Sequence, residues 1–466
     1  MIDRIRGYSI FFCGLLYVGT ALAGITSLEG LLAAITLLVL IQCLPAINAI
    51  TKVVFTALFG IGSILLIWSG AGIAVWRSAL IKNGDILTLM LFVPLLSVPF
   101  KFPRYQHSLK QVIQKIIQSS SSSVYVFTHA ISHMLGVIFN LACIPMTYYI
   151  IKAGADIKNP NIMAGAAARG YTTTCFWSPN SGAVGLVLAY WGGSVVEIIP
   201  FGLPLAVIAL AVGWFENQYL SNLLTRKEYK TKKNEFENEN NQAAITVPDN
   251  HNSNKDFYWL VFAVMLLLGI VIILDWKTSL GILVIVPVMS LLYPFAWSIF
   301  AGEQQRHWIS FKNFLSDTLP RMSNEVVIFL GAGFFAVAVS SSKIGRYLPG
   351  VFNSVSDSPT LLVAIIIIIV VGLSIIGFHP VLTITSIVSS LTPQLVGLPH
   401  SLLAVMVLAA WGLAVTCSPF SACSLSLSNI TGVNPLIVGL RWQLVFTGLL
   451  FIVTLLYFNI MLSCFY

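Results

Sequence analysis

The stretch Thr172-Thr173-Thr174-Cys175-Phe176-Trp177-Ser178-Pro179-Asn180-Ser181-Gly182 places hydroxyls, a proline and a glycine inside an otherwise apolar run. A second stretch, Thr416-Cys417-Ser418-Pro419-Phe420-Ser421-Ala422-Cys423, repeats its Ser-Pro-x-Ser-small core in another apolar run. Proline removes a backbone donor and clashes with the preceding turn, so each stretch predicts a broken helix. We call residues 178–181 the first break and residues 418–421 the second break.

The composition indicates a membrane protein. Of the 466 residues, 57% are hydrophobic and 9% are charged, and the mean hydropathy is +0.88. Soluble domains carry about a quarter charged residues. Apolar runs near the bilayer-spanning length predict an all-α polytopic membrane protein with about 11 transmembrane helices plus two re-entrant hairpins. The predicted runs are 8–24, 31–50, 53–76, 86–100, 124–151, 162–191, 195–215, 257–274, 280–300, 325–342, 361–378, 401–427 and 436–457.

A polar segment divides the chain into two halves. Residues 1–26 predict an N-terminal transmembrane helix, although residues 1–23 could also be a cleaved signal peptide. Residues 27–215 form the first predicted repeat and residues 257–466 a second repeat of inverted topology. Residues 216–256, rich in Asn, Lys and Glu, predict a solvated cytoplasmic linker between them.

Each half carries one break at a matching place. Such pairs of interrupted helices mark the midplane binding site of secondary transporters built from inverted repeats. The histidines His133 and His379 precede the first and second breaks at similar distances, which supports the repeat. Most of the 25 Lys and Arg residues fall on one side of the predicted spans. This bias predicts a cytoplasmic N-terminus in the cytoplasmic membrane.

The breaks predict a binding site. A helix start leaves about four N–H groups unpaired and carries the positive end of a dipole, so it can hold an anion. Free carbonyls at a break can coordinate Na⁺. The predicted substrate-binding residues are Thr173, Thr174, Ser178, Pro179, Asn180, Ser181, His379, Thr383, Ser418, Pro419 and Ser421. The predicted ion-coupling residues are His133, Asn140, Gly182 and Thr416.

Structural explanations of the same residues stay open. The breaks could be proline kinks whose hydroxyls bond back to the helix, and each histidine could simply pack as a neutral side chain. Arg169 and Arg441 could each pair an anionic solute, or extend to the membrane interface. The seven cysteines show no C-x-x-C pair, so neither a disulfide framework nor a metal site is expected.

The chain resembles the ion transporter superfamily, which includes divalent anion:sodium symporters, citrate carriers, arsenite permeases and sodium/proton antiporters. The resemblance is carried by Gly377-Phe378-His379-Pro380, by the two Ser-Pro-x-Ser segments and by the inverted halves. It implies a homodimer in which a transport domain moves as an elevator against a fixed scaffold. Hairpins are expected at 111–151 and 361–397 and broken helices at 162–191 and 401–427, or with the two assignments exchanged. The symporters' Ser-Asn-Thr tips have only an interrupted counterpart, Ser428-Asn429-Ile430-Thr431.

These patterns predict a secondary active transporter for a small anionic solute. The acids of the apolar runs fall near span ends, so Na⁺ is favoured over H⁺ as the coupling ion. The alternatives are an exporter of an inorganic or lipid-linked anion, a Na⁺/H⁺ antiporter, a channel and a membrane-embedded enzyme. No catalytic residue and no cofactor other than Na⁺ is expected. The expected partners are the solute, the lipid bilayer and a second copy of the chain, and no nucleic acid.

The predicted topology puts residues 216–256 in the cytoplasm and Tyr466 outside. A single cysteine at Ser253 and one at the C-terminus should therefore react with an impermeant thiol reagent from opposite faces of the membrane. Labelling of both from the same face would remove the argument for inverted repeats.

Overall fold

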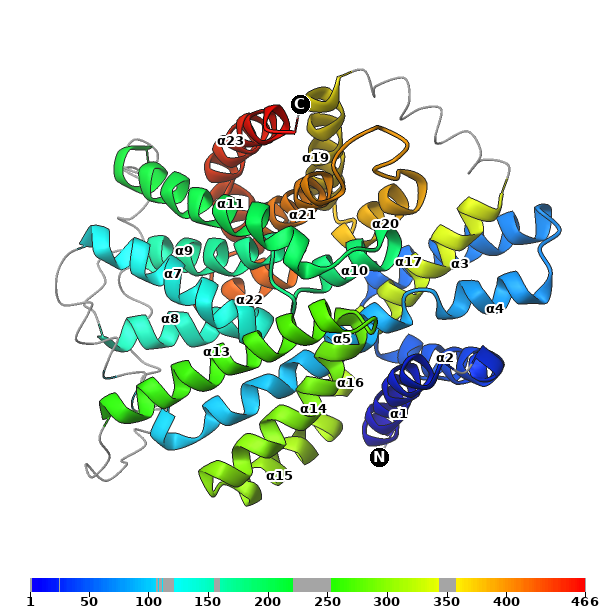
Figure 1. The fold of residues 1–466 in the computed structure, drawn as a ribbon, viewed down its shortest axis with the longest axis horizontal. Helices are drawn as coiled ribbons and strands as arrows, with labels where there is room; N and C mark the ends of the chain where they lie inside the picture. The colour runs from blue at the N-terminus through cyan, green and yellow to red at the C-terminus, as the bar shows by residue number, and fades with distance from the viewer. Residues whose placement is uncertain are drawn as a thin grey trace.

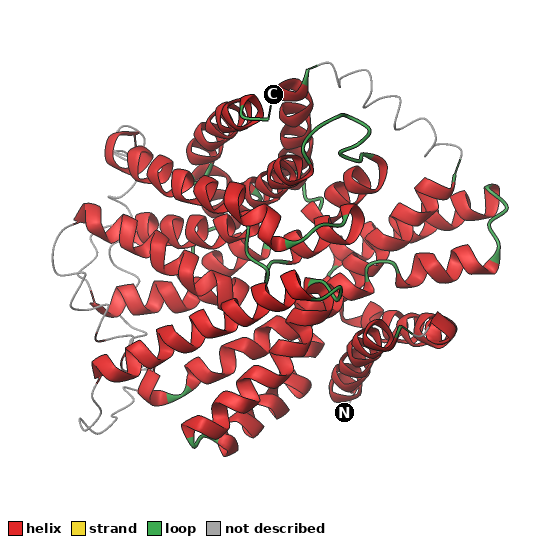
Figure 2. Cartoon of the chain, in the orientation of Figure 1, coloured by secondary structure: helices red, strands yellow, loops and turns green. Residues whose placement is uncertain are grey.

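The computed structural model describes residues 2–24, 26–105, 108, 111, 121–154, 160–220, 253–342 and 358–465. These residues form helices and loops, and no strand occurs among them (Figures 1 and 2). Ten of the described helices are long and apolar enough to cross a membrane. The prediction of an all-α polytopic membrane protein is confirmed. Most of the predicted linker, residues 221–252, lies outside the described part of the chain.

The first half opens with α1 (Ile2–Ala23), α2 (Glu29–Cys43), α3 (Ala49–Trp68), α4 (Ile73–Ile81) and α5 (Gly84–Phe92), which continues into the 3₁₀ segment η3 (Val93–Lys101). It then contains α7 (Ser121–Phe139), α8 (Cys143–Gly154), α9 (Pro160–Thr173), α10 (Gly182–Trp191) and α11 (Val195–Phe215). The second half contains α13 (Ser253–Lys277), α14 (Ile282–Ala301), α15 (Gln304–Asn313), α16 (Leu319–Arg321), α17 (Ser323–Ser341), α19 (Pro359–Ile375), α20 (Pro380–Ser390), α21 (His400–Cys417), α22 (Ala422–Thr431) and α23 (Leu444–Ser463).

Two predicted span boundaries were wrong. The predicted run 53–76 ends as a helix at Trp68, and the next apolar helix begins at Ile73 rather than at residue 86. Gly70, with φ +66°, allows the turn between them. Arg77 was expected in a loop, but it lies inside α4 and pairs with Glu29 of α2 at 3.2 Å. The neighbouring acid explains why the basic residue is tolerated in the helix.

The same order of elements occurs in both halves. In the first half, the span α4–α5 is followed by the hairpin α7/α8, the broken helix α9/α10 and the closing helix α11. In the second half, α17 is followed by the hairpin α19/α20, the broken helix α21/α22 and the closing helix α23. In each half, the first arm of the hairpin packs against the first part of the broken helix, α7 on α9 and α19 on α21. The repeat boundaries, 27–215 and 257–466, and the inversion across the membrane remain predictions.

Glycines let the central helices approach closely. A Cβ at Gly170 of α9 would lie 2.2 Å from the His129 backbone oxygen of α7. A Cβ at Gly412 of α21 would lie 2.5 Å from the Phe176 ring, just before the first break. Small residues at helix contacts are the usual means of close packing in membranes, where lipid supplies no hydrophobic drive. The position of the first break is therefore fixed by its contacts with α7 and α21.

We predict that Gly170→Ala lowers the thermal stability of the purified protein, because overpacking of this kind costs about 1–3 kcal/mol. Gly165→Ala is the matched control on the same helix: its Cβ would meet its nearest neighbour at 3.6 Å, and Ala favours a helix over Gly by about 1 kcal/mol. Thermal unfolding in detergent measures both. Equal melting temperatures for the two variants would contradict the packing described.

Candidate solute-binding site

Both predicted breaks interrupt helices as expected. The first helix stops at Thr173 and passes through the 3₁₀ turn η5 (Thr174–Phe176) before α10 starts at Gly182. The second stops at Cys417, and α22 starts at Ala422. The predicted hairpins are α7/α8 and α19/α20, so the exchanged assignment is wrong. Asn140, with φ +52°, lies at the tip of the first hairpin, and Gly377, with φ +105°, at the tip of the second.

The serines of each break hydrogen-bond to their own backbone. Ser181 accepts from the Ala183 amide at 3.3 Å as the N-cap of α10. Ser421 accepts from the Ser424 amide at 3.1 Å as the N-cap of α22. One residue before each proline, a serine accepts from the amide two residues on, Ser178 at 3.3 Å and Ser418 at 3.2 Å. Within the membrane, these bonds satisfy backbone donors that lipid cannot.

Each break is also tied to the hairpin of its own half. The Asn180 side-chain amide donates to the Val137 carbonyl of α7 at 2.7 Å. The Ser418 hydroxyl donates to the Ser374 carbonyl of α19 at 2.6 Å. The residues of the first pair are 43 positions apart and those of the second 44. This near-equal spacing is the strongest structural sign of the repeat.

The helices that lead into the two breaks meet through a pair of buried threonines. The Thr416 hydroxyl donates to the Thr172 hydroxyl oxygen at 2.6 Å. Thr172 in turn can donate to the Arg169 carbonyl at 3.2 Å, which is the normal back-bond of a helical threonine. The ends of α9 and α21, 244 residues apart in the sequence, are therefore joined directly. Thr416, predicted to couple the ion, lies at this contact, and so does Thr172 of the first quoted stretch; a role of either residue in transport stays a prediction.

Both histidines have structural partners. His133 accepts from the Trp177 indole N–H at Nε2, at 3.2 Å, so its proton lies on Nδ1. From there it can donate to the Thr173 hydroxyl at 2.9 Å. His379 accepts from the Val381 amide at Nδ1, at 3.2 Å, and caps α20. Each imidazole is thus neutral in this arrangement.

The other predicted site residues are placed as follows. Thr174 donates to the Tyr171 carbonyl at 2.6 Å, and Asn140 accepts from the Tyr171 hydroxyl at 2.8 Å. Thr383 is buried in α20. Gly182, at the start of α10, faces Met90, with 2.7 Å between an added Cβ and the methionine side chain.

At the first break, one hydrogen-bond acceptor and one hydrogen-bond donor are unused among the described residues. Asn180 Oδ1 is buried and has no hydrogen-bond partner among the described residues. Ser178 accepts a bond but donates none in the described part of the chain, whereas Ser418 both donates and accepts. The first break can therefore offer a carbonyl oxygen and a hydroxyl proton to a ligand. At the second break, the serine hydroxyls already donate hydrogen bonds to other protein groups.

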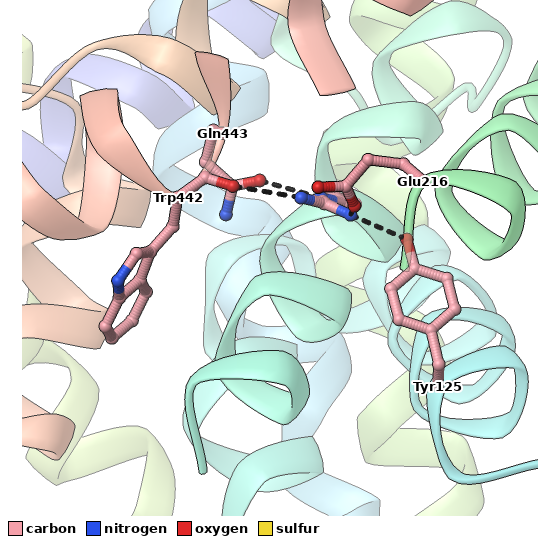
Figure 3. A network of polar contacts seen from close by, with 5 residues as sticks. Tyr125, Glu216, Trp442 and Gln443 are labelled. Carbon is pink, nitrogen blue, oxygen red and sulfur yellow. Dashed lines mark hydrogen bonds and ion pairs between the residues drawn. The ribbon is translucent and has the colours of Figure 1, made fainter. Parts of the chain in front are cut away.

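Arg169 is buried inside the protein and already paired with an acid. Its Nη1 lies 2.7 Å from Glu216 Oε2, and both side chains are buried. The guanidinium also donates to the Tyr125 hydroxyl, the Trp442 carbonyl and the Gln443 side-chain oxygen, at 3.2, 3.0 and 2.8 Å. Figure 3 shows Tyr125 and Glu216 on one side of this network and Trp442 and Gln443 on the other. Neither interpretation of Arg169 from the sequence included this buried network.

A signal for this network was present in the sequence. Arg169 lies in the middle of an apolar run with no acid nearby in the chain, so its counter-ion had to come from another span. Glu216 was assigned to the polar linker because it follows a long apolar run. The structure instead buries it at the end of α11, where α11 passes into the π-helical turn η6 (Glu216–Leu220).

The fold resembles those of solved membrane transporters. The YdaH transporter of Alcanivorax borkumensis superposes with a TM-score of 0.51 at 11% identity, over 82% of this chain and 88% of that one. MtrF of Neisseria gonorrhoeae, described as illuminating a class of antimetabolite efflux pumps, superposes with a TM-score of 0.55 at 13% identity, over 85% and 86%. No protein-family model and no curated protein matches the sequence. This chain is a multi-pass membrane protein with the fold of these transporters.

We predict that Thr172→Val and Thr416→Val each lower stability by about 1 kcal/mol, the usual net value of a hydrogen bond. Because the two hydroxyls share one bond, the double variant should lose less than the sum, by about 0.6 kcal/mol or more. Unfolding of the two single variants and the double variant gives this coupling. Strict additivity would show that the threonines do not bond to each other.

Proposed function

We propose that this chain is a secondary active transporter that moves a small anionic solute across the cytoplasmic membrane. The observation that carries the proposal is the junction of the two helices that lead into the breaks. Each break starts a serine-capped helix, each is bonded to its own hairpin, and the Thr172–Thr416 bond joins the helices that precede them. Paired interrupted helices of this kind form midplane binding sites in transporters.

An anion is the solute class that this junction favours. The starts of α10 and α22 present backbone N–H groups and the positive ends of two helix dipoles. The free hydroxyl proton of Ser178 adds a side-chain donor. Arg169 cannot serve as the anion's partner, because Glu216 already neutralises it. The solute is therefore held by dipoles and hydroxyls rather than by a guanidinium.

We further propose Na⁺ as the coupling ion. Asn180 Oδ1 at the first break is a buried carbonyl oxygen with no partner in the described part of the chain, and carbonyl oxygens are a ligand type that a hard cation prefers. Proton coupling is the second candidate, because Glu325 Oε2 of α17 is also buried and has no hydrogen-bond partner among the residues that the structure describes. The resemblance to the ion transporter superfamily leads us to propose a homodimer and elevator-type alternating access.

A thermal-shift panel of anions, with and without Na⁺, selects a solute, and its uptake into proteoliposomes tests the function. Uptake should saturate and should follow an imposed Na⁺ gradient at constant pH. Equal uptake driven by a pH gradient without Na⁺ would transfer the coupling role to Glu325. Uptake that stays linear with concentration would contradict a carrier and indicate a channel.

The same proteoliposomes test the site. Pro179→Ala and Pro419→Ala should each reduce uptake about tenfold or more, because a re-formed helix removes the free N–H groups. Pro204→Ala is the control, since Pro204 lies inside the continuous helix α11. Equal uptake by all three variants would show that the breaks are ordinary kinks.

A further inference from the structure

The Arg169 network joins two packed units of the fold. Arg169 and Tyr125 lie on α9 and α7, which are held together at Gly170. Glu216 follows α11, while Trp442 and Gln443 precede α23. The bonds of one guanidinium thus connect the hairpin and broken helix of the first half with the closing helices of both halves. In the predicted topology this network lies toward the cytoplasmic face.

A contribution to folding stability does not by itself explain the presence of the buried Arg169–Glu216 ion pair. Removing two charges from water costs several kcal/mol per ion, and an apolar pair of similar volume is often as stable or more stable. Intramembrane ion pairs therefore call for a functional explanation. Arg169 makes four bonds to protein groups from three segments, which fixes the position of those segments relative to α9 in this conformation.

The partners of Arg169 lie at helix irregularities. Glu216 begins the π-helical turn η6, and Trp442 directly follows a second one, η9 (Leu436–Arg441). The Trp442 amide bonds to the Ile437 carbonyl at 3.0 Å, five residues back, instead of four. Such turns interrupt the regular helix ladder and occur often at functional sites. Two of the three π-helical turns in the described residues flank this one guanidinium.

Polar groups around the network remain without partners. Both ring nitrogens of His129, one turn beyond Tyr125 on α7, are buried and unbonded among the described residues. The Gln443 side-chain nitrogen is also unbonded within the described part of the chain. Buried polar groups normally find protein or water partners. These groups are therefore available to a second arrangement of the network or to water.

We propose that the Arg169–Glu216 network is a latch between the two units, which closes the predicted cytoplasmic side in this conformation and opens by hydration during the cycle. The π-helical turns let the closing helices move, and the unbonded groups around the network bind the entering water. This inference rests on the proposed transport function, because a latch needs two alternating states.

A cysteine at Ser178 reports the opening without a known solute. It is introduced into a background in which the seven native cysteines are Ala or Ser. An impermeant maleimide is applied to inside-out and to right-side-out vesicles. Glu216→Gln should raise labelling from the cytoplasmic face about tenfold or more, because the closed state would then hold an uncompensated buried charge. Glu197→Gln is the control: Glu197 belongs to an exposed pair with His400 at 3.8 Å and should leave labelling unchanged.

A second variant distinguishes a latch that opens during the transport cycle from a contact that only stabilises the fold. Arg169→Met combined with Glu216→Leu removes both charges, so the protein should lose less thermal stability than Glu216→Gln, which leaves Arg169 as an unpaired buried charge. Its cytoplasmic labelling should fall below that of the parent, since an apolar contact cannot be hydrated. Parent-like labelling in this variant or in Glu216→Gln would overturn the latch while leaving the transport proposal intact. A cysteine labelled from neither face in any variant would overturn both.

Discussion

A helix broken inside a bilayer exposes backbone groups that lipid cannot satisfy, and the rest of this structure depends on how they are satisfied. Serines cap the two helix restarts, at Ser181 and Ser421, and Asn180 and Ser418 tie the breaks to the neighbouring hairpins. Each hairpin must therefore lie against its own broken helix. The close α7–α9 contact at Gly170 and the α19–α21 contact follow from this requirement.

The two breaks differ in which of their polar groups are already hydrogen-bonded. The first break keeps a hydroxyl proton at Ser178 and a carbonyl oxygen at Asn180 that no described residue occupies. The second break uses Ser418 in both directions, toward Ser374 and Phe420. In the proposed transporter, the first break therefore provides ligands, while the second mainly holds the geometry. This difference between the two breaks follows from the hydrogen bonds that their hydroxyls already make, since each hydroxyl has only one proton to donate.

The sequence predicted the features that depend on local chemistry. Proline, serine and glycine determine where a helix stops, so the breaks and both hairpins could be located. Contacts between distant residues could not be predicted. The partners of Arg169 include Glu216, 47 residues away, and Gln443, 274 residues away, and no local pattern links them. For the same reason, the sequence could not show that the Trp177 indole donates to His133, whose predicted role in ion coupling stays a prediction.

The central claim is that the helices leading into the two breaks, one from each half, meet at a single place. A cysteine-free protein with Thr172→Cys and Thr416→Cys, and with a protease site inserted in residues 216–256, tests this directly. These cysteines replace hydroxyl oxygens that lie 2.6 Å apart. After oxidation and cleavage, the halves should migrate as one band in denaturing gels without reductant and as two bands with it. Two bands under both conditions would contradict the account.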